Sequence, residues 1–224
     1  MKKSLLAMAA VVLFAVPAMA AISTTKHNLG AGGTGTVKTN GTSEICIFCH
    51  TPHQATSNKP LWNRNTASIS SSYSSPTLDN TVDTAYLNSA NSVAPLCLSC
   101  HDGSTGLGAG VVNTFDKTAL PGWSQGITGA KAIGSDGISN DHPVGMIYNP
   151  ANDLTPYGVP GLRTAVASNP GPSTGPLDKW FRTSGGNNYM DCSSCHDVHG
   201  KDGNPKFLRR SNASSNFCLT CHLK

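Results

Sequence analysis

One five-residue pattern, Cys-x-x-Cys-His, occurs four times in this chain and constrains its fold more than any other feature. In c-type haem attachment, two such thiols bond to the porphyrin and the adjacent histidine takes one axial position on the iron. The cysteines of the four copies are Cys46, Cys49, Cys97, Cys100, Cys192, Cys195, Cys218 and Cys221. The histidines that follow them are His50, His101, His196 and His222. The sequence therefore predicts four covalently bound haem c groups, each with one of these histidines as the proximal ligand of its iron.

A single Cys-x-x-Cys pair also occurs in zinc sites and in thiol redox sites. Here each of the four pairs is followed directly by histidine, and together the pairs use all eight cysteines of the chain. No cysteine is left for a separate structural disulfide. The repetition therefore favours haem over paired zinc sites or disulfides.

Four further histidines lie outside the motifs. They are His27, His53, His142 and His199. Four irons have eight axial positions, and the eight histidines of the chain match that number. We therefore predict that these four residues are the distal iron ligands. The alternatives are that some of them are exposed side chains with no ligand role, or that Met146 or Met190 binds an iron.

The spacing of two histidine pairs restricts which iron each residue can reach. His53 follows His50, and His199 follows His196, three residues later. On a helix such residues share one face with a rise of about 4.5 Å, whereas the two axial ligands of one iron lie on opposite faces of the porphyrin. The second histidine of each pair is therefore expected to bind a different haem, which requires the haems to lie close together.

The other two outer histidines lie on loop segments. His142 precedes Pro143, which favours an extended backbone, and its simplest partner is the haem held by His101. His27 lies in a glycine-rich arm, nineteen residues before Cys46, so it can reach a haem far from the arm itself. The alternative for the arm is a frayed terminus with an idle histidine.

The composition limits the kind of core that the chain can build. With 23 glycines, 14 prolines and only 6% aromatic residues, the chain cannot form an ordinary apolar core of matching size. We predict a mostly irregular fold, with short α-helices around a stacked tetrahaem core and little β-structure. Trp62, Tyr73 and Tyr86 are expected to cover porphyrin faces, and no regular strands are expected over 54–94. The helix signals are Thr42 or Ser43 before the first motif, Pro95 and Gly103 around the second, Asp191 and Gly200 around the third, and Ser214 or Ser215 before the fourth.

Residues 1–20 are typical of an export signal. Lys2 and Lys3 precede an apolar run from Leu5 to Val16, and Ala18-Met19-Ala20 fits cleavage before residue 21. The apolar run is too short for a membrane-spanning helix, and residues 21–224 are predicted to form one tetrahaem domain. Its parts are an amino-terminal arm (21–45), a segment for haems 1 and 2 (46–101), a Gly/Pro-rich loop region with His142 (102–190), and a segment for haems 3 and 4 (192–222).

The charge balance does not indicate a nucleic-acid partner. The formal net charge is +4, and charged residues are only 12% of the chain. Of the 16 Lys and Arg residues, Lys2 and Lys3 are removed with the signal, so the remaining chain has 14 basic residues and 12 acidic residues. Haem propionates would add negative charge and make the loaded protein mildly acidic.

The ordered segments CIFCHTPH, CLSCHDG, DHPVG, CSSCHDVHG and CLTCH resemble those of multihaem cytochromes c with doubled Cys-x-x-Cys-His motifs. The four motifs, the size, the signal and the His-bearing arm are most similar to the outer-surface tetrahaem members that polymerise into conductive filaments. The resemblance implies a head-to-tail polymer in which His27 binds a haem of the neighbouring protomer. Such a contact does not close on itself, so it propagates as a fibre.

The leading functional prediction is extracellular electron transfer through four bis-histidine haems, by an electron carrier rather than an enzyme. Its partners would be copies of itself, other cytochromes and extracellular acceptors, and its location the cell surface. One alternative is a monomeric electron shuttle in the periplasm. Another is a multihaem reductase, which needs an iron with an open position, often signalled by lysine in place of the motif histidine. No such replacement is present in the four motifs.

Overall fold

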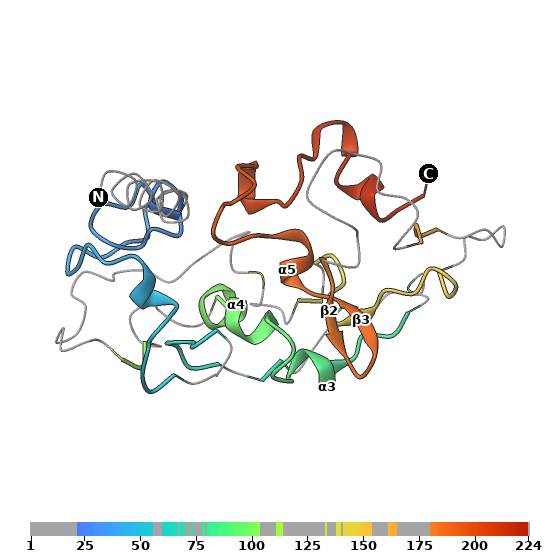
Figure 1. Ribbon diagram of the computed structural model, residues 1–224, viewed down its shortest axis with the longest axis horizontal. Coiled ribbons are helices and arrows are strands. Elements are labelled where there is room, and N and C mark those ends of the chain that lie inside the picture. Colours follow the sequence, from blue (N-terminus) through green and yellow to red (C-terminus); the bar gives the residue numbers. More distant parts are fainter. Residues whose placement is uncertain are drawn as a thin grey trace, which may run out of the picture.

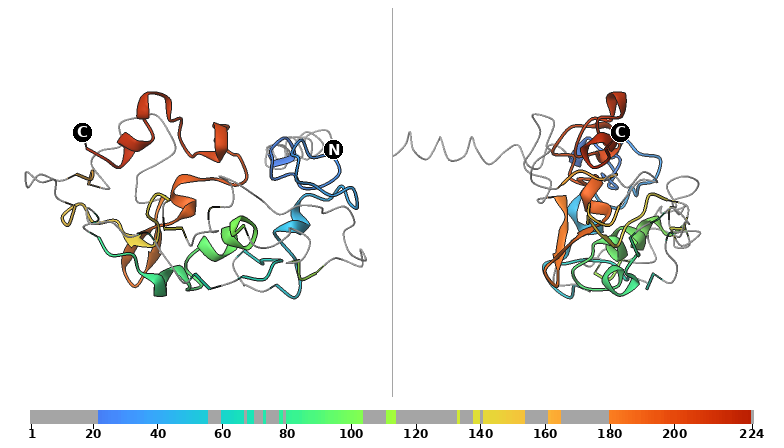
Figure 2. Two further views of the ribbon diagram at one scale, coloured as in Figure 1. Left: turned by 180° about the vertical axis from the view of Figure 1, so that it is seen from behind. Right: turned by 90° about the vertical axis from the view of Figure 1, so that its right-hand side faces the viewer.

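The computed structural model describes residues 22–55, 60–66, 68–69, 73, 78, 80–103, 111–113, 133, 138–139, 141–153, 161–164 and 180–223. The predicted export signal, 1–20, lies outside the described residues, as does much of the loop region 102–190. The described chain is elongated, with the amino-terminal arm at one end and the carboxyl-terminal residues at the other (Figures 1 and 2).

Most of the described backbone is irregular, which confirms the predicted fold class. The one named sheet among the described residues has three short antiparallel strands, in the order β1-β3-β2. They are β1 (Met146–Ile147), β2 (Arg182–Ser184) and β3 (Asn187–Met190). Gly185 and Gly186, with φ of 55° and 80°, form the two-residue turn between β2 and β3. A turn of this kind needs positive φ at both positions, which glycine adopts without strain.

Helices are few and short. They are α3 (Thr84–Leu87), α4 (Ala94–His101) and α5 (Cys192–Cys195). Single 3-10 turns occupy Cys46–Phe48, Pro205–Phe207, Ala213–Ser215 and Cys218–Thr220. The second and third motifs therefore lie on α-helices, whereas the first and fourth lie on 3-10 turns.

The helix boundaries agree with the sequence signals for the second motif and only in part for the others. Pro95 lies in the first turn of α4, and Gly103 follows its end with a φ of 74°. Asp191 caps α5 as expected, but the helix ends at Cys195 rather than near Gly200, because His196 is extended. The side-chain caps predicted for the other two motifs are wrong: Ile45 and Phe217 precede those turns and form no side-chain cap.

The described apolar residues form three small clusters rather than one core. One contains Tyr86, Leu87, Ala94 and Tyr189, the second contains Tyr148, Trp180, Phe181 and Met190, and the third contains Leu29, Ile47 and Phe48. Tyr86, one of the three aromatic residues expected to cover porphyrin faces, is stacked on Tyr189 with ring centroids 3.8 Å apart. Met146 and Met190, the alternative iron ligands, are paired across β1 and β3 and pack against the second cluster.

Candidate haem-binding sites

Three pairs of histidine rings face each other across similar gaps. The ring centroids are 6.2 Å apart for His27 and His101, and 6.3 Å apart for His50 and His199. The third pair, His142 and His222, is also separated by 6.3 Å. Metal–imidazole bonds are about 2 Å long, so two imidazoles on opposite sides of one iron have centroids about 6 Å apart. Each pair therefore fits the two axial ligands of one haem iron.

In three of the eight histidines, Nδ1 lies within hydrogen-bonding distance of a backbone carbonyl, which leaves Nε2 to bind a metal. His50 Nδ1 donates to the carbonyl of Pro60 at 2.7 Å, and His196 Nδ1 donates to that of Lys206 at 2.9 Å. His142 Nδ1 lies 3.1 Å from the carbonyl of Pro143. A carbonyl can only accept, so the proton is held at Nδ1 and Nε2 is left with a free lone pair for iron.

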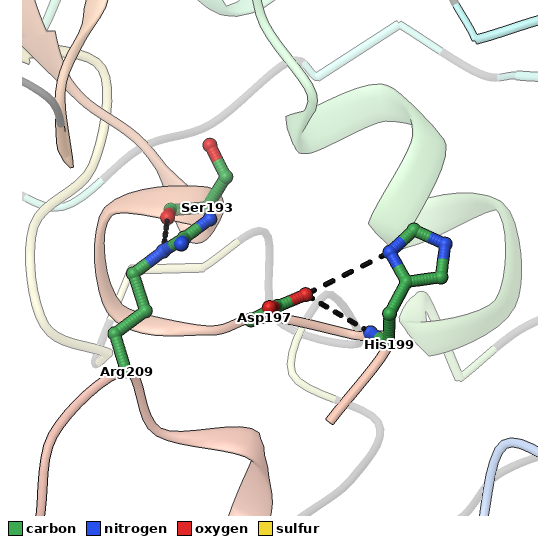
Figure 3. Close-up of polar contacts among 4 residues, drawn as sticks. All are labelled: Ser193, Asp197, His199 and Arg209. Carbon is green, nitrogen blue, oxygen red and sulfur yellow. Dashed lines mark hydrogen bonds and ion pairs between the residues drawn. The ribbon is translucent and has the colours of Figure 1, made fainter. Parts of the chain in front are cut away.

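Asp197 orients His199 in a related way (Figure 3). The Asp197 carboxylate accepts a hydrogen bond from the backbone N–H of His199 at 3.1 Å. The same oxygen lies 3.7 Å from Nδ1 of His199, which itself remains 61% exposed. A carboxylate at Nδ1 is a common second partner of a metal-binding histidine, because it fixes the ring and raises its basicity.

The histidine pairs differ in detail from the pairs expected from sequence. His199 lies beside His50 and not beside its neighbour His196, in line with the expectation that it serves another haem. The helical reason given for that expectation is wrong, because His196 is extended and His50 lies in an isolated β-bridge. His142 lies beside His222 rather than beside His101, its expected partner. The histidine beside His101 is His27.

Two histidines of the eight have no such partner. Within the described part of the chain, no ring contact joins His53 or His196 to a second histidine. Both side chains are exposed. The three pairs therefore use six histidines, and the motif histidine of the third site faces outward.

The cysteines place the four motifs in sequence order along the molecule. The Cys49 thiol of the first motif is close enough to Cys100 of the second for their charges to interact. Cys97 of the second lies beside Cys192 of the third and raises the pKa of its thiol. Cys195 of the third interacts with Cys221 of the fourth. Neighbouring attachment sites therefore adjoin each other in an unbroken series.

Three of the thiols lie in buried surroundings that suit an uncharged sulfur. Burial raises the pKa of Cys49 to about 12 and that of Cys195 to about 12. Burial also raises the pKa of Cys221 to about 11. All eight cysteines are free of disulfides. A thioether to haem carries no charge, so the residues present fit the attachment chemistry that the motifs imply.

Two segments of equal length, 46–64 and 192–210, share one backbone design. In each, the chain returns after the motif and pairs with it in antiparallel fashion. Thr51 N–H donates to the Leu61 carbonyl at 2.9 Å, and Asp197 N–H donates to the Phe207 carbonyl at 2.8 Å. Leu61 and Phe207 both have left-handed backbones, with φ of 61° and 60°. We call this returning segment, 60–64 in the first copy and 206–210 in the second, the strap. It was not predicted from the sequence, although its equal distance from the motif in both copies is a signal for it.

The side chains of the two straps also hold equivalent positions. Asn63 Nδ2 donates to the Ile47 carbonyl at 2.6 Å, and Arg209 Nε donates to the Ser193 carbonyl at 2.6 Å (Figure 3). The acceptors are the first residues after Cys46 and Cys192. Each strap therefore clamps the backbone between the two cysteines of its own motif.

The next residue of each strap reaches the following motif. The guanidinium of Arg64 donates to the Ser99 carbonyl at 3.1 Å, and Arg210 donates to Thr220 Oγ1 at 3.1 Å. Ser99 and Thr220 both directly precede the second cysteine of their motif. The chain thus contains two copies of one doubled-motif unit, 46–101 and 192–222, as its sequence pattern indicated.

A segment from another part of the chain, which contains Arg163, binds the backbone of the fourth motif in the way that a strap does; we call it the Arg163 strap. Arg163 N–H donates to the Cys221 carbonyl at 2.7 Å, and Arg163 Nε donates to the Leu219 carbonyl at 2.7 Å. Tyr148, on the segment after His142, contacts the same strap through a hydrogen bond from its hydroxyl to the Arg163 carbonyl. This arrangement brings the His142 segment and His222 to one place.

The family model described as "Doubled CXXCH motif" matches residues 186–224, which include the second doubled-motif unit. No curated protein matches the chain. The match shows a doubled Cys-x-x-Cys-His domain over these residues, and such motifs imply covalent haem c, as in multihaem c-type cytochromes. In the described part of the chain, no helix has the length and apolar character required to cross a membrane.

Proposed function

We propose that this protein is an exported electron carrier that conducts through four haem c groups, each with two histidine ligands. The observation that carries the proposal is the set of three histidine pairs at 6.2–6.3 Å, which join residues far apart in the sequence. When bound, haem supplies reversible one-electron chemistry. The protein holds the groups, sets their order and fills the axial positions.

Filled axial positions favour electron transfer over catalysis on a small molecule. A reductase needs an iron position that its substrate can enter. Three of the four motif histidines already face a second imidazole in the same chain. A multihaem reductase remains the alternative at the third motif only, where His196 faces outward.

We further propose that the protein polymerises and that His53 of one copy binds the haem held by His196 of the next. In this chain the extra histidine of the second unit, His199, lies beside His50, the histidine of the first motif of the first unit. The extra histidine of the first unit is His53, and the motif histidine still without a partner is His196. Repeating the same relation between units across two copies pairs His53 of one copy with His196 of the other, and it leaves one His196 at one end and one His53 at the other end for further copies.

This proposal assigns His27 a different place from the one that the family resemblance implied. His27 lies beside His101 of its own chain, and its ring is stacked on Phe207 at 4.4 Å. These contacts support a role for His27 as a ligand within the protomer. An open series of equal contacts grows into a filament and does not close. Like the tetrahaem filament cytochrome OmcE, which the motif order resembles, the protein would then work at the cell surface.

A second observation supports the same contact surface. Phe207 of the second strap is covered by His27, whereas Leu61 at the equivalent position of the first strap is 45% exposed. Leu61 therefore lies uncovered on the first unit, beside the exposed His53, whereas its counterpart Phe207 on the second unit is covered within the chain. A monomeric periplasmic shuttle is the alternative, and it would need another group to cover this surface.

The test combines haem counting, spectroscopy and microscopy on the purified protein. We expect four haems per chain, filaments by electron microscopy, and a high-spin ferric signal that is present in separated protomers and absent from filaments. His53→Ala should keep four haems and abolish filaments. His27→Ala is the matched control: it should add a high-spin haem to the protomer and leave the His53 contact intact. Filaments that persist in His53→Ala would overturn the proposed contact.

A further inference from the structure

Asp191 is a fully buried carboxylate at the junction of the second and third haem sites. Its exposed fraction is 0%. Its Oδ2 accepts hydrogen bonds from Tyr86 Oη at 2.9 Å, Ser92 Oγ at 2.8 Å and the Val93 N–H at 3.0 Å, and its Oδ1 accepts one from the Cys192 N–H at 2.6 Å. Within the described residues, no lysine or arginine forms an ion pair with it. All four of these hydrogen bonds to the carboxylate come from neutral donors.

The carboxylate serves two haem-binding helices at once. It is the N-cap of α5, where the hydroxyl of Ser194 completes a capping box with it. It also accepts from Val93, the residue that precedes α4. Figure 1 shows α4 and α5 beside each other near the middle of the molecule. One acidic group thus joins the start of the helix that carries Cys97 to the start of the helix that carries Cys192.

The charge lies close to both attachment points. Asp191 directly precedes Cys192, and the Cys192 thiol lies beside the Cys97 thiol. Contact with Cys97 is the largest cause that raises the pKa of Cys192, burial is the next, and the charge of Asp191 adds to them. Burial and the adjacent Asp191 also raise the pKa of Tyr86, so that phenol keeps its proton and remains a donor.

We propose that Asp191 lowers the reduction potentials of the haems attached at Cys97 and Cys192 relative to those of the other two haems. Reduction adds an electron to a site beside a fixed negative charge. In a buried region of low dielectric this repulsion is weakly screened, so the oxidised form is favoured. The two central sites of the series would then have lower potentials than the terminal ones. The proposal rests on the proposed haem content, and it makes Asp191 a positioning and charge-setting residue rather than a haem ligand.

The chain offers a matched control in Asp83. Asp83 is the N-cap of α3, accepts from the Tyr86 N–H at 2.9 Å, and accepts from the hydroxyl of Tyr189 at 3.1 Å. Tyr189 is the ring stacked on Tyr86. The two aspartates therefore have the same capping role and equivalent tyrosine donors, but α3 carries no haem cysteine.

The experiment is a spectroelectrochemical titration of the full haem-loaded protein and its variants. Asp191→Asn retains a capping side chain and removes the charge, and it should raise two of the four midpoint potentials and leave two unchanged. Asp83→Asn should change none of the four. Four unchanged potentials in Asp191→Asn, or equal shifts in both variants, would overturn the proposal.

A second variant keeps the test decisive if Asp191→Asn does not fold. Tyr86→Phe retains the ring and the carboxylate but removes one hydrogen bond that stabilises its charge. It should lower the same two potentials, and an absent or upward shift would contradict the proposal. Haem counting on the unmodified protein separates the two questions: fewer than four haems refutes the proposed function, whereas four haems with unchanged variant potentials refutes only the role of Asp191.

Discussion

The two doubled-motif units have the same internal design and opposite surroundings. In 46–64 and 192–210, the motif, the left-handed strap residue and the clamp on the inter-cysteine backbone recur with equal spacing. In the second unit, His199 and Phe207 are met by His50 and His27 of the same chain. In the first unit, no histidine ring lies beside the equivalent His53 among the described residues, and Leu61 is 45% exposed. The comparison teaches that the local unit forms the attachment motif, whereas neighbouring segments determine which histidine lies beside it.

The largest expected difference between the units is spectroscopic. His199→Ala should leave the iron held by His50 without its distal ligand and so give separated protomers one additional high-spin ferric haem. His53→Ala should leave the protomer spectrum unchanged, because His53 has no histidine partner in its own chain. Electron paramagnetic resonance of both variants, with haem content as the control, checks this. Equal spectra for the two variants would mean that the units are not different in the way described.

The strap clamps should differ in energy although they are equivalent in position. Asn63 is fully buried, and its side chain makes three hydrogen bonds: one to the Ile47 carbonyl, one to the Asn113 carbonyl and one from the Asn113 N–H. Arg209 is half-buried and donates one to Ser193. We expect Asn63→Ala to cost about 3 kcal/mol and Arg209→Ala about 1 kcal/mol of unfolding free energy. Denaturant titration of the loaded protein measures both, and a larger cost at Arg209 would show that the second strap has the greater structural role.

The smallest effect is expected at the left-handed strap residue. Phe207→Ala removes the ring stacked on His27, an aromatic contact worth about 1 kcal/mol. The His27 ligand should then dissociate more often, and carbon monoxide should bind the reduced protein about five-fold faster. Leu61→Ala should leave this rate unchanged in separated protomers and weaken only their assembly. An equal change in rate for both variants would remove the distinction between the covered and the uncovered strap.

Several features of the fold could be predicted from local sequence. Pro95 and Gly103 bracket α4, and Asp191 caps α5, because these residues act on the backbone within one turn. The caps predicted for the first and fourth motifs were wrong for a related reason. Thr42 Oγ1 accepts from the N–H of Glu44 and forms its own local turn, so it is not available to a helix at Cys46.

The pairing of the distal histidines could not be predicted in the same way. The expected partner of His142 was His101, but the hydrogen bond from Tyr148 to the Arg163 strap brings the His142 segment to the fourth motif. His27 then occupies the position beside His101, where Phe207 supports its ring. The pairing of histidines depends on contacts between distant segments, some of them more than a hundred residues apart in the sequence. Short-range spacing contains no signal for such contacts.

The sequence by itself determined the attachment chemistry, the number of motifs and the loop-rich character of the chain, because these follow from residue identity over a few neighbouring positions. Only the tertiary structure decided which imidazoles face each other, which strap is covered, and that Asp191 joins two haem helices. The physical reason is that an iron needs ligands from opposite sides of a flat ring. The second ligand therefore comes from a distant segment, and folding alone determines which segment that is.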